Sequence, residues 1–235
     1  MKIAMNALTL TDVTKTFTMH LQGGLRLPVL RNVSFAAAPG ECVVLTGPSG
    51  AGKSSILKLI YGNYRCDSGH ILVSAGGSPV DIALAEPREI LALRQRALGY
   101  VTQFLRAVPR VSALDIVAEP LILKGTPRED ATARAAMMLR RFNVPERLWS
   151  LPPATFSGGE QQRINLARGL LPEHPILLLD EPTASLDANN RAVVVDIIRE
   201  RKAQGAAIIA IVHDESVRDE IADVGVDVTY FATAA

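Results

Sequence analysis

The sequence is poor in cysteine, in aromatic residues and in long apolar runs, and its charges nearly cancel. It has only two cysteines, Cys42 and Cys66, which excludes a framework of several disulfides and leaves no metal-ligand spacing. No apolar run approaches the roughly eighteen residues that are needed to cross a bilayer. The 25 basic and 24 acidic residues give a formal net charge of +1, without the basic surplus typical of nucleic-acid-binding proteins. We therefore expect a cytoplasmic protein with no direct membrane insertion and no nucleic-acid partner.

The remaining composition is typical of a globular protein. Hydrophobic residues make up 48% of the 235 positions, enough to bury the core of one large domain or two intimate ones. The first residues superficially resemble a signal peptide, but Asn6, Asp12 and Lys15 interrupt any apolar core, so we interpret them as leading into a strand. Cys42 lies in an apolar run and is expected to be a buried, reduced thiol.

Hydrophobic periodicity changes twice along the chain. Residues 6–46 contain short β segments around a turn-rich piece, 20–28, which predicts a hairpin loop. Residues 104–153 change to helical spacing and predict a separate helical lobe. Beyond that lobe, apolar runs alternate again with helical segments, and the last residues, 229–235, are expected to fray.

The alternation of apolar runs and helices predicts a parallel sheet. Three polar residues, Gln103, Asp180 and His213, each come at the end of an apolar run. Because the carboxyl ends of parallel strands share one edge of a sheet, ligands bind there. We expect these three side chains to lie close together at a ligand site.

The most specific motif runs from Gly47 to Ser54 and fits the phosphate-binding pattern G-x-x-x-x-G-K-[ST] between a predicted strand and a predicted helix. Glycines let backbone N–H groups converge on phosphate oxygens, and a helix N-terminus adds partial positive charge. Lys53 would reach the β- and γ-phosphates, and Ser54 would give a hydroxyl to Mg²⁺. Taken alone, the pattern could also be a chance glycine-rich turn. The predicted phosphate-binding residues are Gly47, Pro48, Ser49, Gly50, Ala51, Gly52, Lys53, Ser54 and Ser55.

Two adjacent carboxylates, Asp180 and Glu181, follow the apolar run 176–179. Side chains alternate along a strand, so one carboxylate can orient Mg²⁺ while the other faces an attacking water as general base. Two acids at a strand end also occur as solvated turn residues. The phosphate-binding motif in the same chain favours the functional interpretation.

The stretch from Ser157 to Gln161 has the form of a capping box, because Glu160 follows Ser157 by three residues. A plain capped helix would explain these two residues, but not the paired glycines between them. We predict a second helix N-terminus that is open to an anion.

These motifs, in this order, resemble the ATP-binding cassette (ABC) ATPases. The resemblance implies an α/β fold: a P-loop NTPase of the ABC type with a RecA-like parallel-sheet core, an N-terminal antiparallel β subdomain and an inserted helical subdomain that carries the signature. It implies one cassette domain over 6–225, with the nucleotide-binding core at 6–103 and 171–225 and the helical subdomain at 104–170. A C-terminal tail, 226–235, follows.

The resemblance further implies a nucleotide sandwich, in which two cassettes dimerise head to tail around ATP and Mg²⁺ and convert ATP and water to ADP and phosphate. For Phe17, ordinary packing is an equally good interpretation of the residue by itself. The assigned residues are Phe17 for adenine stacking; Ser54, Gln103 and Asp180 for Mg²⁺; Glu181 and His213 for catalysis; Ser157, Gly158, Gly159, Glu160 and Gln161 for the partner's ATP; and Ser185 and Asp187 for the dimer seam.

Three segments, 103–114, 143–149 and 175–189, look very like the PhnL family of the carbon-phosphorus lyase system. That family implies work with the lyase core complex, pairing with itself or with a PhnK-like sister cassette, and a role in forming ribose 1-methylphosphonate 5-triphosphate in alkylphosphonate catabolism. The assigned residues surround the β- and γ-phosphates, several bonds from the ribose carbon that loses adenine. We therefore expect ATP hydrolysis to open or close the complex and another subunit to transfer the ribose.

Two other functions are compatible with the same motifs. The chain could be the ATPase of an ABC membrane transporter, in which a helix of the membrane subunit would dock near Phe104–Arg110. It could also be a scaffold that binds ATP without useful turnover, although the presence of Glu181 argues against this.

Overall fold

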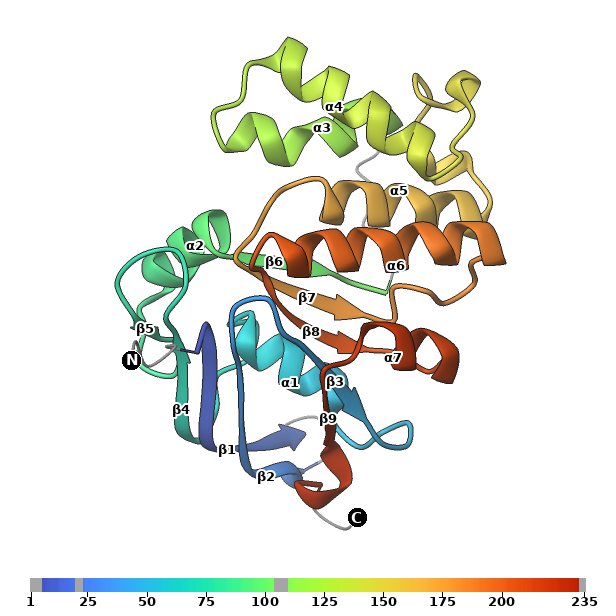
Figure 1. Ribbon diagram of the computed structural model, residues 1–235. Coiled ribbons are helices and arrows are strands. Elements are labelled where there is room, and N and C mark those ends of the chain that lie inside the picture. The colour runs from blue at the N-terminus through green and yellow to red at the C-terminus, as the bar shows by residue number, and fades with distance from the viewer. Residues whose placement is uncertain (1–5, 20–22, 104–109, 233–235) are drawn as a thin grey trace.

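The computed structural model describes residues 6–19, 23–103 and 110–232, which form two β-sheets and the helices that surround them (Figure 1). The larger sheet has the strand order β6-β7-β8-β3-β9, and all its neighbouring strands are parallel. The prediction of a parallel sheet is therefore confirmed. Its strands are β3 (Cys42–Thr46), β6 (Leu98–Val101), β7 (Ile176–Asp180), β8 (Ala207–Ile211) and β9 (Val224–Asp227).

The smaller sheet is antiparallel, with the order β2-β1-β4-β5. The predicted short β segments are instead two long strands of 12 and 13 residues that form one hairpin. Phe17 pairs with Leu27, and Met19 with Leu25, so the pairing continues into the segment predicted as a loop. Backbone pairing across the hairpin outweighed the turn signals there. The strands are β1 (Leu8–Met19), β2 (Leu25–Ala37), β4 (Ser68–Val73) and β5 (Val80–Asp81).

Helices cover both faces of the parallel sheet, which explains why its strands are apolar on both sides. α1 lies between the two sheets and shares a buried cluster with them. α5 and α6 cover the opposite face (Figure 1). The helices are α1 (Lys53–Ile60), α2 (Pro87–Arg96), α3 (Ala113–Leu123), α4 (Arg128–Arg141), α5 (Gly158–Leu170), α6 (Ala188–Ala203) and α7 (Glu215–Ile221), with 3₁₀ turns at Glu146–Leu148, Pro153–Thr155 and Val228–Tyr230.

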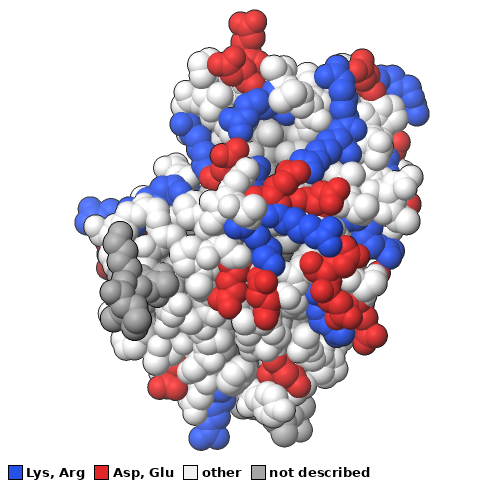
Figure 2. Space-filling model, viewed as in Figure 1, with Lys and Arg blue, Asp and Glu red and all other residues white. Residues whose placement is uncertain are grey.

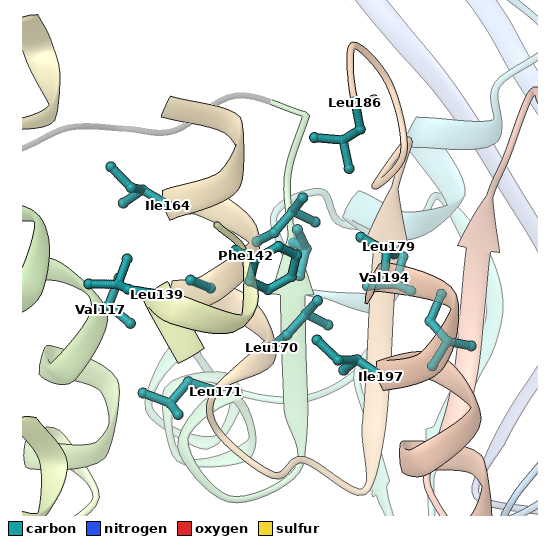
Figure 3. Packing of buried hydrophobic residues seen from close by; sticks show 14 of the residues in the cluster. Val117, Leu139, Phe142, Ile164, Leu170, Leu171, Leu179, Leu186, Val194 and Ile197 are labelled. Atoms are coloured by element: carbon teal, nitrogen blue, oxygen red, sulfur yellow. The ribbon is translucent and has the colours of Figure 1, made fainter. Parts of the chain in front are cut away.

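The predicted helical lobe does not have a core of its own. Val117 of α3, Leu139 of α4 and Ile164 of α5 belong to the same buried cluster as Leu179 of β7 and Val194 of α6 (Figure 3). α5 lies between the outer helices and the sheet, and its apolar side chains contact both. A movement of α3 and α4 would therefore be transmitted to the sheet through α5.

The C-terminal residues differ from the prediction of a tail that begins at 226. Val226 pairs with Leu45 and Asp227 with Thr46, so the strand β9 extends the central sheet past the expected boundary. Val228 is fully buried, and Ala232 forms a bridge with Leu30. The predicted tail is the segment in which the resemblance to known cassettes weakens. Its pairing with β3 and its packing against the hairpin hold it in place.

Acidic and basic side chains are interspersed on the face shown in Figure 2. α6 and α7 are joined by the ion pairs Arg191–Asp214 (2.7 Å) and Arg199–Glu220 (2.8 Å). Exposed pairs of this kind contribute roughly 0–1 kcal/mol each. Among the described residues, none of the helices has the length and apolar character that a membrane span requires.

Candidate functional site

The loop between β3 and α1 forms the floor of the candidate site. Gly52, the N-cap of α1, has a φ of 97°. A Cβ atom at this position would lie 2.7 Å from Cδ2 of Leu30, so both the backbone conformation and the space require glycine. Because Gly52 has no side chain to cap the helix, the first N–H groups of α1 are available to an anion.

A cavity of about 390 Å³ opens over this loop. Lys53 is only 7% exposed, and its Nζ donates hydrogen bonds to the carbonyl oxygens of Gly47 (2.7 Å) and Pro48 (2.8 Å). Both partners are neutral carbonyls, so these two contacts do not form an ion pair that would compete with an anion for Lys53. The cavity is lined by Val29, Ser49, Gly50, Gly52, Lys53, Ser54, Ser55, Glu181 and His213.

Asp180, at the end of β7, is buried, and its two carboxylate oxygens have different partners. Ser54 Oγ donates to Oδ1 at 3.0 Å, and the hydroxyl of Tyr100 donates to Oδ2 at 3.0 Å. Hydroxyl and carboxylate oxygens suit Mg²⁺, which usually keeps several waters and binds substrate phosphates. The part of the chain that the structure describes has no cluster of three or more His, Cys, Asp or Glu for a metal. The donor set fits Mg²⁺ held together with a nucleotide.

Glu181 lies between two polar side chains from neighbouring strand ends. Its backbone has a φ of 54°, a costly conformation for a residue other than glycine. Its Oε1 is 2.8 Å from His213 Nε2, and its Oε2 accepts a hydrogen bond from Gln103 Nε2 at 3.1 Å. The structure thus brings Gln103 and His213, two of the three side chains expected to lie close together, into contact with Glu181 at one edge of the sheet. The third, Asp180, is hydrogen-bonded to Ser54 and Tyr100 instead. A carboxylate held in this way beside the cavity can accept a proton from a water molecule.

A second cavity, of about 250 Å³, lies at the N-terminus of α5. Ser157 donates hydrogen bonds to Glu160 Oε2 from its hydroxyl (2.7 Å) and from its backbone N–H (2.9 Å), which confirms the predicted capping box. These hydrogen bonds lower the pKa of Glu160, so the carboxylate stays ionised. The cavity is lined by Gln103, Gly158, Gly159, Gln161, Gln162, Ala184 and Ser185.

Eight predicted site residues line neither cavity: Phe17, Gly47, Pro48, Ala51, Ser157, Glu160, Asp180 and Asp187. Asp187 caps α6 and accepts a hydrogen bond from the backbone N–H of Asn190 at 2.8 Å, which lowers the pKa of Asp187. The ring of Phe17 makes an edge contact with Tyr64, with 5.1 Å between the ring centroids, and Lys15 Nζ lies 5.3 Å from its centroid. Adenine stacking on Phe17 stays a prediction.

The sequence did not indicate three residues that belong to this region. Val29 of β2 lines the first cavity, and Tyr100 of β6 holds Asp180. Asn165 of α5 donates a hydrogen bond to the backbone carbonyl of Thr102. Tyr100 lies three residues before Gln103, in a strand that we predicted, but only the pairing of β6 with β7 brings it to Asp180.

Comparison with known proteins agrees with this geometry. The family model described as ABC transporter matches residues 30–184, more than half of the chain. The lipoprotein-releasing system ATP-binding protein LolD of Maricaulis maris is 39% identical over 192 residues, which cover 81% of this chain and 82% of that protein. The pyoverdine export ATP-binding/permease protein PvdT of Pseudomonas entomophila is 36% identical over 211 residues, which cover 88% of this chain and 31% of that longer protein.

A solved structure shares the whole architecture. The ATP-binding cassette MJ0796, described as a dimer in a post-hydrolysis state bound to ADP and Pi, superposes with a TM-score of 0.84 at 28% sequence identity. The superposition covers 94% of this chain and 95% of the other. The parallel sheet and the antiparallel β part are therefore those of an ABC cassette.

Proposed function

Because this chain belongs to the ABC transporter family of ATPase cassettes, with ATP and Mg²⁺ as its cofactors, we propose that it is the ATP-hydrolysing subunit of a membrane transporter. The observation that supports hydrolysis is the position of Glu181 in the lining of the first cavity, where it is hydrogen-bonded to Gln103 and adjacent to His213. In this proposal, Glu181 takes a proton from the attacking water. His213 and Gln103 orient the carboxylate.

Other residues around the first cavity would bind the phosphates, Mg²⁺ and the adenine. Lys53 would leave the two loop carbonyls and bind phosphate oxygens, and the N–H groups at the start of α1 would bind others. Ser54 and Asp180 would hold Mg²⁺, which supplies charge compensation for the phosphates when bound. The adenine would extend toward Phe17, whose ring is partly exposed.

We propose that two cassettes meet head to tail, so that the α5 N-terminus of one chain faces the phosphate loop of the other. Three observations support this arrangement. The second cavity is lined by the signature glycines, Gly158 and Gly159, which are assigned to a partner's nucleotide, and by Ser185, which is assigned to the dimer seam. The related cassette MJ0796 is described as dimeric. Among the described residues, none that lines the first cavity belongs to α5.

A groove beside the edge strand β6 offers a place for a membrane subunit. It has a volume of about 370 Å³ and lies between α2, the end of α3 and the end of α5. Leu91 and Leu123, which line it, are 58% and 73% exposed and give the groove apolar borders. Arg110 lines an adjoining cavity of about 540 Å³. The rest of the predicted docking segment, residues 104–109, lies outside the described residues.

The occupant that we propose for this groove is a helix of a permease, because relatives are named as parts of lipoprotein-releasing and export systems.

A second candidate partner is the carbon-phosphorus lyase core complex. The observation that favours it is the sequence likeness of 103–114, 143–149 and 175–189 to PhnL. In that setting, ATP hydrolysis at Glu181 would drive opening or closure of the complex during formation of ribose 1-methylphosphonate 5-triphosphate, with a PhnK-like cassette as a possible dimer partner. No carboxylate or base of the candidate site would take part in the release of adenine.

One pair of experiments tests these proposals. Affinity purification of the tagged chain from its own cells, with and without detergent, identifies the partner. Recovery of an integral membrane protein supports the transporter, and recovery of a phosphonate-cleaving complex overturns it in favour of the second candidate. Product analysis then compares the wild type with Glu181→Gln. Glu181-dependent ADP and phosphate support hydrolysis, whereas ATP binding without turnover in the assembled complex would indicate a scaffold.

A further inference from the structure

We propose that Tyr100 is a positioning residue for Mg²⁺, which it orients through Asp180 and Ser54. The inference rests on the proposed function, because it assumes that Asp180 and Ser54 hold Mg²⁺ with ATP. Tyr100 OH, Asp180 and Ser54 Oγ form a continuous chain of hydrogen bonds, each 3.0 Å long. Ser54 is the end of this chain that faces the cavity.

The strand register explains why Tyr100 reaches Asp180. Tyr100 of β6 pairs with Leu178 of β7, and Asp180 lies two residues further along β7. Side chains two residues apart point to the same face of a sheet, so Asp180 and Leu178 share the face on which Tyr100 lies. A long aromatic side chain can span the diagonal between Tyr100 and Asp180. A shorter polar residue at this position would not.

Neighbouring aromatic and cationic side chains fix the direction of the phenol. The ring of Tyr61 packs against the ring of Tyr100, with 5.1 Å between the centroids. The guanidinium of Arg94 lies over the ring of Tyr61, 4.3 Å from the ring centroid, and Arg94 Nε donates a hydrogen bond to the backbone carbonyl of Tyr61. The ring of Tyr100 is thus held from the side, with its hydroxyl directed at Oδ2 of Asp180.

In this arrangement each carboxylate oxygen of Asp180 accepts a hydrogen bond from a different hydroxyl group. Tyr100 donates to Oδ2 and Ser54 donates to Oδ1, so the lone pairs of the Ser54 oxygen are not used in this chain of hydrogen bonds. The hydroxyl of Tyr100 donates the hydrogen bond to Asp180. Groups that orient metal ligands in this way typically change metal affinity by about 10- to 100-fold when removed.

The test compares nucleotide binding with and without the metal in the purified full chain. Titrations of ATP are made in EDTA and at increasing Mg²⁺ concentrations, for the wild type, Tyr100→Phe and a control, Tyr230→Phe, which removes an exposed phenol. We expect Tyr100→Phe to keep the wild-type affinity in EDTA and to need about tenfold more Mg²⁺ for half of the metal-dependent gain. Tyr230→Phe should match the wild type in both conditions.

Two further variants separate the possible failures. Ser54→Ala should remove the Mg²⁺-dependent gain; if it does not, the proposed metal site is wrong and the inference falls with it. If Ser54→Ala removes the gain but Tyr100→Phe responds to Mg²⁺ like the wild type, only the role of Tyr100 is overturned. The double variant Tyr100→Phe/Asp180→Asn should be no worse than Asp180→Asn alone, because Tyr100 acts through Asp180. Additive losses would contradict that route.

Discussion

The side-chain amide of Asn165, in the middle of α5, donates a hydrogen bond to the backbone carbonyl of Thr102 at 2.5 Å. Thr102 directly precedes Gln103, whose side-chain amide donates a hydrogen bond to Glu181. α5 also begins with the capping box of Ser157. One helix therefore connects the second cavity to the segment that carries Gln103, and a rotation of α5 would pull on the residue beside the candidate base.

Asn165→Ala should lower the free energy of unfolding by about 1–3 kcal/mol, because it leaves a part-buried carbonyl without this donor. Urea denaturation measures the change. Asn189→Ala, in the exposed first turn of α6, is the matched control and should change stability by less. Equal stability of Asn165→Ala and the wild type would show that the hydrogen bond makes no net contribution.

Lys53→Ala should weaken ATP binding by at least about tenfold, because the ammonium is the buried positive charge at the cavity floor. The measurement is a titration of the isolated chain with ATP and Mg²⁺. Lys124→Ala, at the groove beside α3, removes a lysine away from that cavity and should bind ATP as the wild type does. Undiminished affinity in Lys53→Ala would contradict the proposed phosphate site.

Glu181→Gln should bind ATP normally and hydrolyse it about 10²- to 10⁴-fold more slowly, because an amide cannot act as the base. Steady-state phosphate release gives the rate. Size-exclusion chromatography with ATP should show this variant as a persistent dimer, since the sandwich is not opened by hydrolysis. A variant as fast as the wild type would mean that another group activates the water.

His174 should make stability depend on pH. Burial and, to a lesser extent, the cations Lys124 and Arg201 lower the pKa of His174 to about 4, from about 6.5 in the unfolded chain. The unfolded state therefore binds the proton first, and stability falls as the pH drops from about 6.5 to about 4. Between about pH 7.5 and pH 5, the wild type should lose on the order of 2 kcal/mol more than His174→Gln. Urea denaturation at both pH values measures this, and parallel losses would overturn the prediction.

The two cysteines should react differently. Cys42 is fully buried, and burial raises the pKa of its thiol to about 12. Cys66 is partly exposed, although burial raises its pKa as well. A maleimide at about pH 8 should leave Cys42 unmodified in the folded chain, where Cys66 is the cysteine that can react. After denaturation it should modify both cysteines, as measured by mass spectrometry. Cys66→Ser should not be labelled in the folded state. Rapid labelling of Cys42 would mean that β3 is accessible.

The sequence predicted the parts of the site that depend on short stretches of chain. Gly52 belongs to a phosphate-binding motif of eight consecutive residues, Ser157 and Glu160 cap a helix from three residues apart, and Asp180 follows an apolar strand. These features depend on residues that are close in the sequence, so they can be predicted without knowledge of the fold. The same is true of the parallel sheet, which follows from the alternation of strands and helices.

The tertiary structure decided the contacts that depend on which strands are neighbours. Tyr100 meets Asp180 across 80 positions because β6 pairs with β7, and Asn165 meets Thr102 because α5 packs on β6. The predicted tail, 226–235, includes Val226 and Asp227, the last two residues of β9, and only their pairing with β3 makes them part of a strand. The sequence by itself determined that this protein carries the motifs of an ATP-binding cassette. Strand order and helix packing determined how those motifs are held, because a hydrogen bond between distant residues needs a three-dimensional register that no local pattern encodes.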